Sequence, residues 1–151
     1  MKGNNMARSR QSPDEINLSL LEAVQTEDTE RAVSLIIDQN AYGLGVVNGE
    51  SSFTAALAKR NMEICAEITS SILSLPDKAM VMTDLFKILE AIDRDDIPVL
   101  FNQEVDNRAL PDVDGKVPLL DVVKKVLPAF GQQLTNTIAE IEKSKTPTLA
   151  L

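Results

Sequence analysis

Three groups of residues have types and spacings that could support chemistry. The run Asp112–Gly115 (DVDG) resembles part of a calcium-binding loop, in which carboxylates surround the ion beside a glycine turn. Asp93, Asp95 and Asp96 are close enough in sequence to offer paired carboxylates for acid–base catalysis. Cys65, the single cysteine, could act as a thiol nucleophile. Each interpretation competes with a structural role for the same residues.

The run lacks two of the ligands that a calcium-binding loop requires. Placing Gly115 at loop position 6 puts Leu110 at position 1 and Asp121 at position 12, so two required ligands are missing. The run therefore predicts a turn. The chain contains no histidine, which excludes a Cys/His zinc site and leaves Cys65 without a histidine base. We expect Cys65 to be a small, buried, apolar residue.

The remaining candidates also have simpler structural interpretations. The acidic run at 93–96 lies where other parts of the chain hold helix-breaking and capping residues. Gly43, Gly45 and Gly49 are not followed by the Gly-Lys-Ser/Thr of a phosphate-binding loop, so they predict turns. We therefore predict no catalytic residue, no metal site and no cofactor.

Charge and hydropathy exclude several classes of protein. The 151 residues carry a net charge of −8, and such a surface repels nucleic acids and anionic lipids. Residues 1–13 contribute +3 without any acid, which leaves −11 on the rest of the chain. No window approaches 18 consecutive apolar residues, so we expect no membrane insertion. Residues 1–13 also lack the apolar run of a signal peptide, and we predict a disordered leader and a cytoplasmic protein.

The elements that must position these residues are predicted to be helices. Aromatic residues make up only 3% of the chain and tryptophan is absent, so the core must consist of small and aliphatic side chains at close spacing. Apolar residues recur at helical spacing in short stretches, beginning with Ile16 and Leu20. Polar breaks at Asp28, Asn61 and Asp96 separate the stretches and supply N-caps. The sequence therefore predicts an all-α fold of short helical hairpins.

A spacing near 33 residues repeats along the chain. Ala23, Ala56 and Ala91 each precede a polar break by five residues, and successive alanines are 33 and 35 residues apart. Small side chains at these positions would permit close packing of helices. Gly49 and Gly115 are 66 residues apart, which is twice the same period. Such a period predicts repeated units that bury their apolar faces by stacking on one another.

A unit of two short helices with this period resembles the ankyrin repeat. The family pattern begins G-x-T-P-L-H-x-A-A and continues x-x-G-N-x-E-I-V. Residues Gly49–Cys65 lie on it without a gap, and Asp114–Val123 match its opening at Gly, Pro and Leu. Thr54 and Leu120 replace the family's histidine, and Asp84 replaces the opening glycine of the third unit. The resemblance implies an ankyrin-like solenoid of about four degenerate repeats, made of stacked helical hairpins.

The repeat domain is assigned to residues 14–142, followed by a flexible tail at 143–151. Its units are predicted as 14–48, 49–82, 83–114 and 115–142. The connections at 38–50 and 103–116 are rich in Gly, Asn and Asp, and we expect them to turn back as loops. The family resemblance implies that both loops line one edge of a concave surface.

Partner contacts are predicted on these two connections, where side chains are free of core packing. Tyr42 is expected to be exposed and is the first candidate, because aromatic residues are rare in this chain and frequent in binding hot spots. The −11 on residues 14–151 favours a protein partner with a basic surface. The predicted contact residues are Tyr42, Leu44, Val46, Asn48, Arg108, Leu110 and Asp112.

Three functions remain open on the sequence alone. The favoured one is a non-catalytic protein–protein interaction module that binds through repeat loops and concave helices. The alternatives are a structural or oligomerising helical protein, which a large flat apolar face would indicate, and an enzyme without a recognisable motif. The carboxyl end, with Glu140, Glu142 and Leu149, is similar to the secretion signals of bacterial type IV effectors. That similarity implies a secreted effector acting in the cytosol of a host cell.

Overall fold

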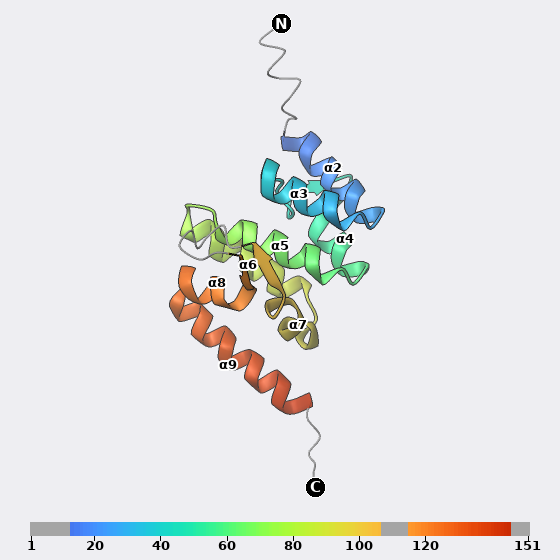
Figure 1. The fold of residues 1–151 in the computed structure, drawn as a ribbon. Helices are drawn as coiled ribbons and strands as arrows, with labels where there is room; N and C mark the ends of the chain where they lie inside the picture. Colours follow the sequence, from blue (N-terminus) through green and yellow to red (C-terminus); the bar gives the residue numbers. More distant parts are fainter. Residues whose placement is uncertain (1–12, 107–114, 146–151) are drawn as a thin grey trace, which may run out of the picture.

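The computed structural model describes residues 13–106 and 115–145. Figure 1 shows short helices that pack on one another along most of this length. The α-helices are α2 (Pro13–Gln25), α3 (Thr29–Gln39), α4 (Ser52–Ala58), α5 (Met62–Leu73), α6 (Lys78–Ala91), α7 (Ile97–Phe101), α8 (Leu119–Val126) and α9 (Pro128–Lys145), with a 3-10 turn η1 (Arg94–Asp96) before α7. Two short antiparallel hairpins join β1 (Val46–Val47) to β2 (Glu50–Ser51) and β3 (Glu104–Asp106) to β4 (Lys116–Pro118). The fold is mostly helical, as predicted.

The connections before α3 and α5 have the same geometry. Glu27 and Arg60 adopt left-handed backbone conformations with φ angles of 59° and 60°. The residue after each of them caps the next helix: Asp28 Oδ1 and Asn61 Oδ1 each accept the backbone N–H three residues later, at 3.2 Å. The 33-residue spacing in the sequence therefore corresponds to a repeated turn, and the helix breaks predicted at Asp28 and Asn61 are confirmed.

The helical pairs α2–α3 and α4–α5 stack on each other. Helix α2 packs on α4, and α3 packs on α5. Ala23 in α2 and Ala56 in α4 are fully buried, and their small side chains permit this close approach. A hydrogen bond of 2.9 Å from Asn61 Nδ2 to Thr29 Oγ1 joins the two turns. These two pairs repeat in space as they do in sequence.

The third helical pair departs from this geometry. Helix α6 is followed by an extended residue, Ile92, and not by a left-handed one. Ala91, expected to pack closely between helices, is exposed. The buried stripe of α6 consists mainly of Val81, Leu85 and Ile88, which leaves Ala91 on the solvent side of the helix. The helix also crosses the unit boundary predicted between residues 82 and 83.

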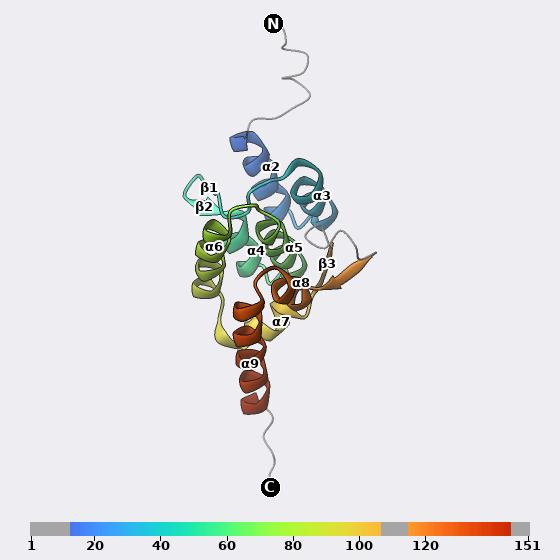
Figure 2. The same ribbon diagram turned by 90° about the vertical axis from the view of Figure 1, so that its left-hand side faces the viewer.

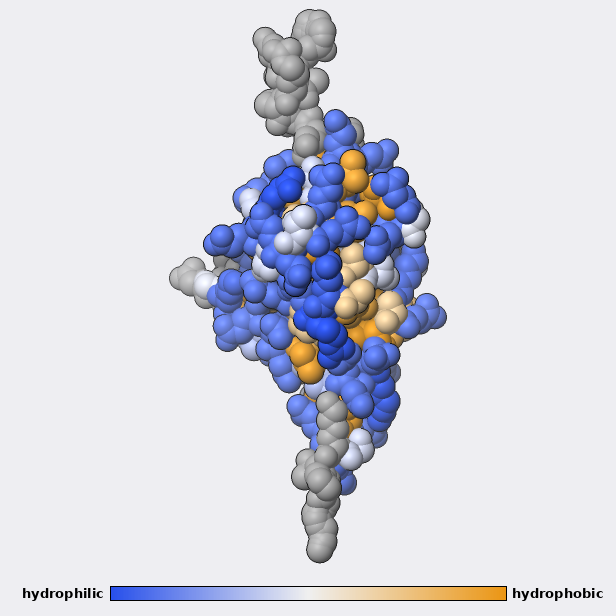
Figure 3. All heavy atoms as spheres, turned by 90° about the vertical axis from the view of Figure 1, so that its right-hand side faces the viewer, coloured by the Kyte–Doolittle hydropathy of each residue, from blue (hydrophilic) through white to orange (hydrophobic). Residues whose placement is uncertain are grey.

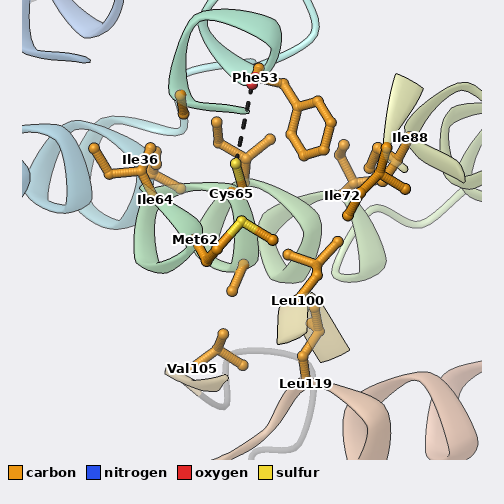
Figure 4. Packing of buried hydrophobic residues seen from close by; sticks show 14 of the residues in the cluster. Ile36, Phe53, Met62, Ile64, Cys65, Ile72, Ile88, Leu100, Val105 and Leu119 are labelled. Carbon is orange, nitrogen blue, oxygen red and sulfur yellow. Dashed lines mark hydrogen bonds between the residues drawn. The ribbon is translucent and has the colours of Figure 1, made fainter. Parts of the chain in front are cut away.

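Helix α5 lies at the centre of the fold. Ten of its 12 residues are buried, and it is in contact with α3, α4, α6, α7, α8 and β3. Figure 4 shows Ile64, Cys65 and Ile72 of α5 among apolar side chains that come from its neighbours. In a linear solenoid each unit contacts only the adjacent units. The packing of α8 on α5 is therefore a departure from a regular stack.

The two hairpins lie on different sides of the molecule. Figure 2 places β1 and β2 at its left-hand edge and β3 at its right. The expectation that the connections at 38–50 and 103–116 share one edge is therefore wrong. The physical reason is that the two hairpins pack on different helices, because β1 contacts α2 whereas β3 contacts α5, on which α8 also packs. Residues 107–114 of the second connection lie outside the described residues.

The last helix is longer than predicted. Helix α9 continues to Lys145, so residues 143–145, which were predicted to belong to the flexible tail, are helical. The sequence contains no proline between Pro128 and Pro147, and the buried Leu134 and Ile138 hold α9 against its neighbours. The predicted leader, apart from Pro13 at the start of α2, and the rest of the predicted tail lie outside the described residues.

Ala56→Arg is expected to destabilise the protein by about 3 kcal/mol or more, because a fully buried position would receive extra volume and an unpaired charge. Ala58→Arg in the same helix and Ala91→Arg are matched controls at exposed positions and should change stability little. Thermal unfolding followed by circular dichroism compares the three variants. Parent-like stability of Ala56→Arg would contradict the packing of α2 on α4.

Candidate interaction surface

The β1–β2 hairpin leaves the helical body through a tight turn. Its two-residue loop consists of Asn48 and Gly49. Their φ angles of 54° and 82° are left-handed, as a type I′ hairpin turn requires, and Asn and Gly adopt this conformation most readily. At the end of the hairpin, Ser51 Oγ accepts the Thr54 N–H at 3.1 Å and so caps α4. Local hydrogen bonds and backbone preferences therefore fix the direction of the hairpin.

The residues before the hairpin are attached to three helices. The Tyr42 N–H donates to Asn17 Oδ1 of α2 at 2.8 Å. The Gly43 carbonyl accepts the N–H of Phe53 in α4 at 2.9 Å. A Cβ atom at Gly43 would collide with the Ile68 side chain of α5, so this close approach requires glycine. Gly43 is therefore needed for packing, and it also lies in a turn as predicted, since the Gly45 N–H donates to the Tyr42 carbonyl at 3.0 Å.

Tyr42 attaches the same segment to α6. Its hydroxyl donates to Asp84 Oδ2 at 2.9 Å, and Asp84 is only 2% exposed. Burial raises the pKa of Tyr42 to about 12, and the hydrogen bond to Asp84 and the charge of that carboxylate add to the rise. The Tyr42 side chain is half-buried. The prediction that Tyr42 is exposed is wrong, because its contact with the distant helix α6 has no local signal in the sequence.

Val46 is the most exposed large apolar residue of this region, and it borders two hollows in the surface. Its side chain is 72% exposed. The first, the α2–hairpin hollow, has a volume of about 370 Å³ and is lined by Asp14, Glu15, Leu18, Val46, Val47 and Asn48. The second, the hairpin–α6 hollow, has a volume of about 330 Å³ and is lined by Leu44, Val46, Gly49, Glu50, Ser51, Phe53, Thr54, Lys87 and Ala91. Val46 thus forms a ridge between two concave areas.

The two hollows differ in charge. The ionisable residues that line the α2–hairpin hollow are Asp14 and Glu15, both acidic. The hairpin–α6 hollow is lined by one acid, Glu50, and one base, Lys87. Glu50 Oε1 accepts a hydrogen bond from Gln25 Nε2 of α2 at 3.1 Å, which ties the hairpin to the first helix. The surface around Val46 is therefore apolar at its centre and mainly acidic at its rim.

The other predicted contact residues differ in their exposure and in whether the structure describes them. Leu44 is half-buried against the hydrophobic core and lines the hairpin–α6 hollow. Asn48 is exposed at the hairpin turn. Val46 lines both hollows, Leu44 lines the hairpin–α6 hollow and Asn48 lines the α2–hairpin hollow. Arg108, Leu110 and Asp112 lie outside the described residues.

Cys65 and Asp96, which were first considered for catalysis, contribute to packing and to contacts between turns. Cys65 is fully buried, and burial raises the pKa of its thiol to about 12. Asp96 forms an ion pair with Arg60, in which Nη1 and Nη2 donate to the two carboxylate oxygens at 2.7 and 2.9 Å. This pair joins the turn before α5 to the turn before α7. In residues 13–106 and 115–145, no group of three or more Cys, Asp or Glu side chains could hold a metal ion.

One buried carboxylate, that of Glu67, is not among the residues predicted from the sequence to be functional. Glu67 of α5 is 2% exposed, and its Oε2 accepts the Asp106 N–H at 3.3 Å. Burial raises the pKa of Glu67, while the Asp106 N–H and the charge of Lys116 oppose the rise. Ser70 Oγ donates to the Asp106 carbonyl at 3.0 Å, so two α5 side chains hold the end of β3. The available signal was the position of Glu67 beside Ile68, within an apolar stretch of helix.

Comparisons of this chain with models of protein families, with curated proteins and with solved structures found no match. No helix within the described ranges is both long and apolar enough to cross a membrane. The function must therefore be inferred from the geometry of the hairpin surface.

The tyrosine titration tests the Tyr42–Asp84 contact. Because the chain has one tyrosine and no tryptophan, phenolate absorbance reports Tyr42 alone. We expect a midpoint near 12 in the folded chain and near 10 in the unfolded chain. Since the folded pKa is the higher one, this contribution to stability is complete below pH 10 and is lost as the pH rises towards 12. Asp84→Asn should lower the folded midpoint, and a midpoint near 10 in the folded parent would contradict the contact.

Proposed function

We propose that this chain is a non-catalytic interaction module that binds a protein partner across the β1–β2 hairpin and the adjoining faces of α2, α4 and α6. The observation that carries the proposal is the 72% exposure of Val46 between two hollows. The hairpin is held by its left-handed turn, by the α4 cap and by the attachments of Tyr42 and Gly43. A rigid apolar ridge loses little conformational entropy when a partner covers it.

The chemistry of the surface favours binding over catalysis. The side chains around the two hollows are carboxylates, one lysine, small polar groups and apolar residues, and the Ser51 hydroxyl there is engaged in capping α4. The buried Cys65 is remote from solvent and has a raised pKa. On the face shown in Figure 3, hydrophobic areas are interrupted by hydrophilic residues, so this side of the molecule does not present a continuous apolar face. We therefore favour the interaction module over the other two functions.

An ankyrin-like origin is part of the proposal. Support comes from the identical turns at Glu27 and Arg60, the stacking of α2–α3 on α4–α5, and a hairpin directly before α4. A second hairpin lies directly before α8. In ankyrin-like proteins, such hairpins and the first helices of the units form the binding surface. The hypothesis of a secreted effector in a host cytosol rests largely on residues beyond 145, which the structure does not describe.

The partner is proposed to present a basic surface with an apolar residue at its centre. Apolar contact with Val46 would contribute up to about 1.5–3 kcal/mol to binding, which is the free energy of burying an exposed side chain of this kind. Carboxylates at the rim, with the net charge of −8 on the whole chain, would mainly raise the association rate and make it dependent on salt.

The proposal is tested by selecting peptides from a random phage-displayed library on the immobilised full-length chain. We expect selected peptides to contain Lys or Arg beside an apolar residue. Val46→Asp should weaken their binding about tenfold or more, because it removes the apolar contact and adds negative charge. Thermal unfolding should be unchanged, since Val46 is mostly exposed.

Val99→Asp is the matched control, because Val99 is also an exposed valine, 40% accessible, in α7. This variant should bind the selected peptides as the parent does. Equal binding by the parent, Val46→Asp and Val99→Asp would refute the assignment of the surface.

A further inference from the structure

The turn of the β1–β2 hairpin places two residues that can react together next to each other. Asn48 is the only asparagine in the sequence that is followed by glycine. The amide carbon of an asparagine side chain lies within reach of the backbone nitrogen of the next residue, and attack by this nitrogen closes a succinimide ring. Asparagine is thermolabile in proteins for this reason. Gly49 has no Cβ atom beside the attacking nitrogen, so it hinders ring closure less than any other residue would.

Both groups are open to solvent in the folded chain. Asn48 is exposed at the rim of the α2–hairpin hollow, and Figure 2 shows the hairpin at the left-hand edge of the molecule. A Cβ atom placed on Gly49 would meet no atom within 4 Å. Among the described residues, no hydrogen bond is made by the Asn48 side chain or by the Gly49 N–H. Water can therefore reach the Gly49 nitrogen, and no hydrogen bond has to break before it attacks.

Asn102 provides a comparison within the same chain. It is exposed like Asn48, but the next residue is Gln103, which has a side chain. The Gln103 N–H also donates to the Leu100 carbonyl at 3.2 Å. A backbone nitrogen that is held in a hydrogen bond loses its proton less readily than a free one. Exposure alone therefore does not make an asparagine of this chain reactive, and the pair Asn48–Gly49 combines exposure with an unhindered nitrogen.

We propose that Asn48 is a site of spontaneous deamidation, at which the β1–β2 turn is covalently altered. The Gly49 nitrogen gives up its proton to water and attacks Asn48 Cγ. A C–N bond forms, and the side-chain nitrogen takes up a proton and leaves as ammonia. Water then opens the succinimide at either of its two carbonyl groups. One opening gives an aspartyl residue, and the other gives an isoaspartyl residue, in which the main chain runs through the former side chain. In both cases the chain gains a carboxylate, consumes one water and releases one ammonia.

The two products affect the hairpin differently. The isoaspartyl product adds a methylene carbon to the main chain of a two-residue loop, whereas a type I′ turn requires two ordinary residues with left-handed φ angles. Because β1 and β2 contain only two residues each, few hydrogen bonds resist this change. The aspartyl product keeps the turn and adds a carboxylate to the acidic rim. Disruption of the turn would release Val46 from its position between the two hollows. The resulting loss of partner binding rests on the proposed function, whereas the modification does not.

The modification is tested by incubating the full-length chain at neutral and at mildly alkaline pH. Peptide mass spectrometry localises the mass increase that accompanies conversion of an amide to an acid. We expect Asn48 to convert about tenfold or more faster than Asn102, a ratio that requires only a small difference in activation free energy. Conversion should be faster at the higher pH, because the attacking nitrogen must lose its proton. The pair Asp114–Gly115 can close the same ring without a change in mass, so it does not interfere.

Asn48→Gly is the matched control, because a Gly-Gly pair also suits a type I′ turn. This variant should unfold at the same temperature as the parent, and ammonia release during incubation should fall sharply. Conversion of Asn48 in the parent no faster than that of Asn102 overturns the proposal. Ammonia release from Asn48→Gly that equals release from the parent overturns it as well.

Binding of the selected peptides separates the modification from the proposed function. The isoaspartyl chain, isolated by ion exchange, should bind them about tenfold or more weakly than the fresh parent. Asn48→Asp represents the aspartyl product and should bind at least as well as the parent, because it keeps the turn and faces a basic partner. Equally weak binding by Asn48→Asp, or parent-like binding by the isoaspartyl chain while Val46→Asp fails to bind, contradicts the effect assigned to the turn. If Asn48 converts as expected but the peptides ignore Val46→Asp, the modification stands and the proposed function fails.

Discussion

Burial of α5 on all sides is the constraint on which the rest of the structure depends. A helix with ten of 12 residues buried can form only if neighbours cover every face, and here α3, α4, α6, α7, α8 and β3 do so. The buried set includes Glu67, Thr69 and Ser70, whose polar atoms need partners. Thr69 Oγ1 donates to the Cys65 carbonyl at 2.9 Å, and the other two hold β3. The same helix therefore supplies both the centre of the hydrophobic core and the hydrogen bonds that hold β3.

The hairpin surface follows from the same constraint. Gly43 passes so close to Ile68 of α5 that no side chain fits, and Tyr42 beside it reaches the buried Asp84 of α6. The segment that leads into β1 is therefore held by contacts with both α5 and α6, and Val46 follows this segment in the chain. Val46 is 72% exposed, whereas Leu44 and Val47 near it in sequence are partly buried against the core.

Local signals made much of the fold predictable. The cap residues Asp28 and Asn61 predicted two helix starts, and their spacing predicted that the turns repeat. The Asn48–Gly49 pair after two valines is a hairpin signal, although only a loop was predicted there. Ala91 shows the limit of such patterns, because its spacing matches that of Ala56 while the buried stripe of α6 excludes it. The packing of α8 on α5 and the Tyr42–Asp84 contact join distant segments and leave no periodic trace.

Native-state hydrogen exchange tests the central position of α5 most directly. If α5 is the helix that all other elements cover, the amides of Ile64 to Leu73 should exchange only through global unfolding and should be the slowest in the chain. Amides of α2 and α9, which have fewer covering neighbours, should exchange through smaller opening events with lower free energies. Exchange in α5 as fast as in α9 would contradict the claim that the fold is built around this helix.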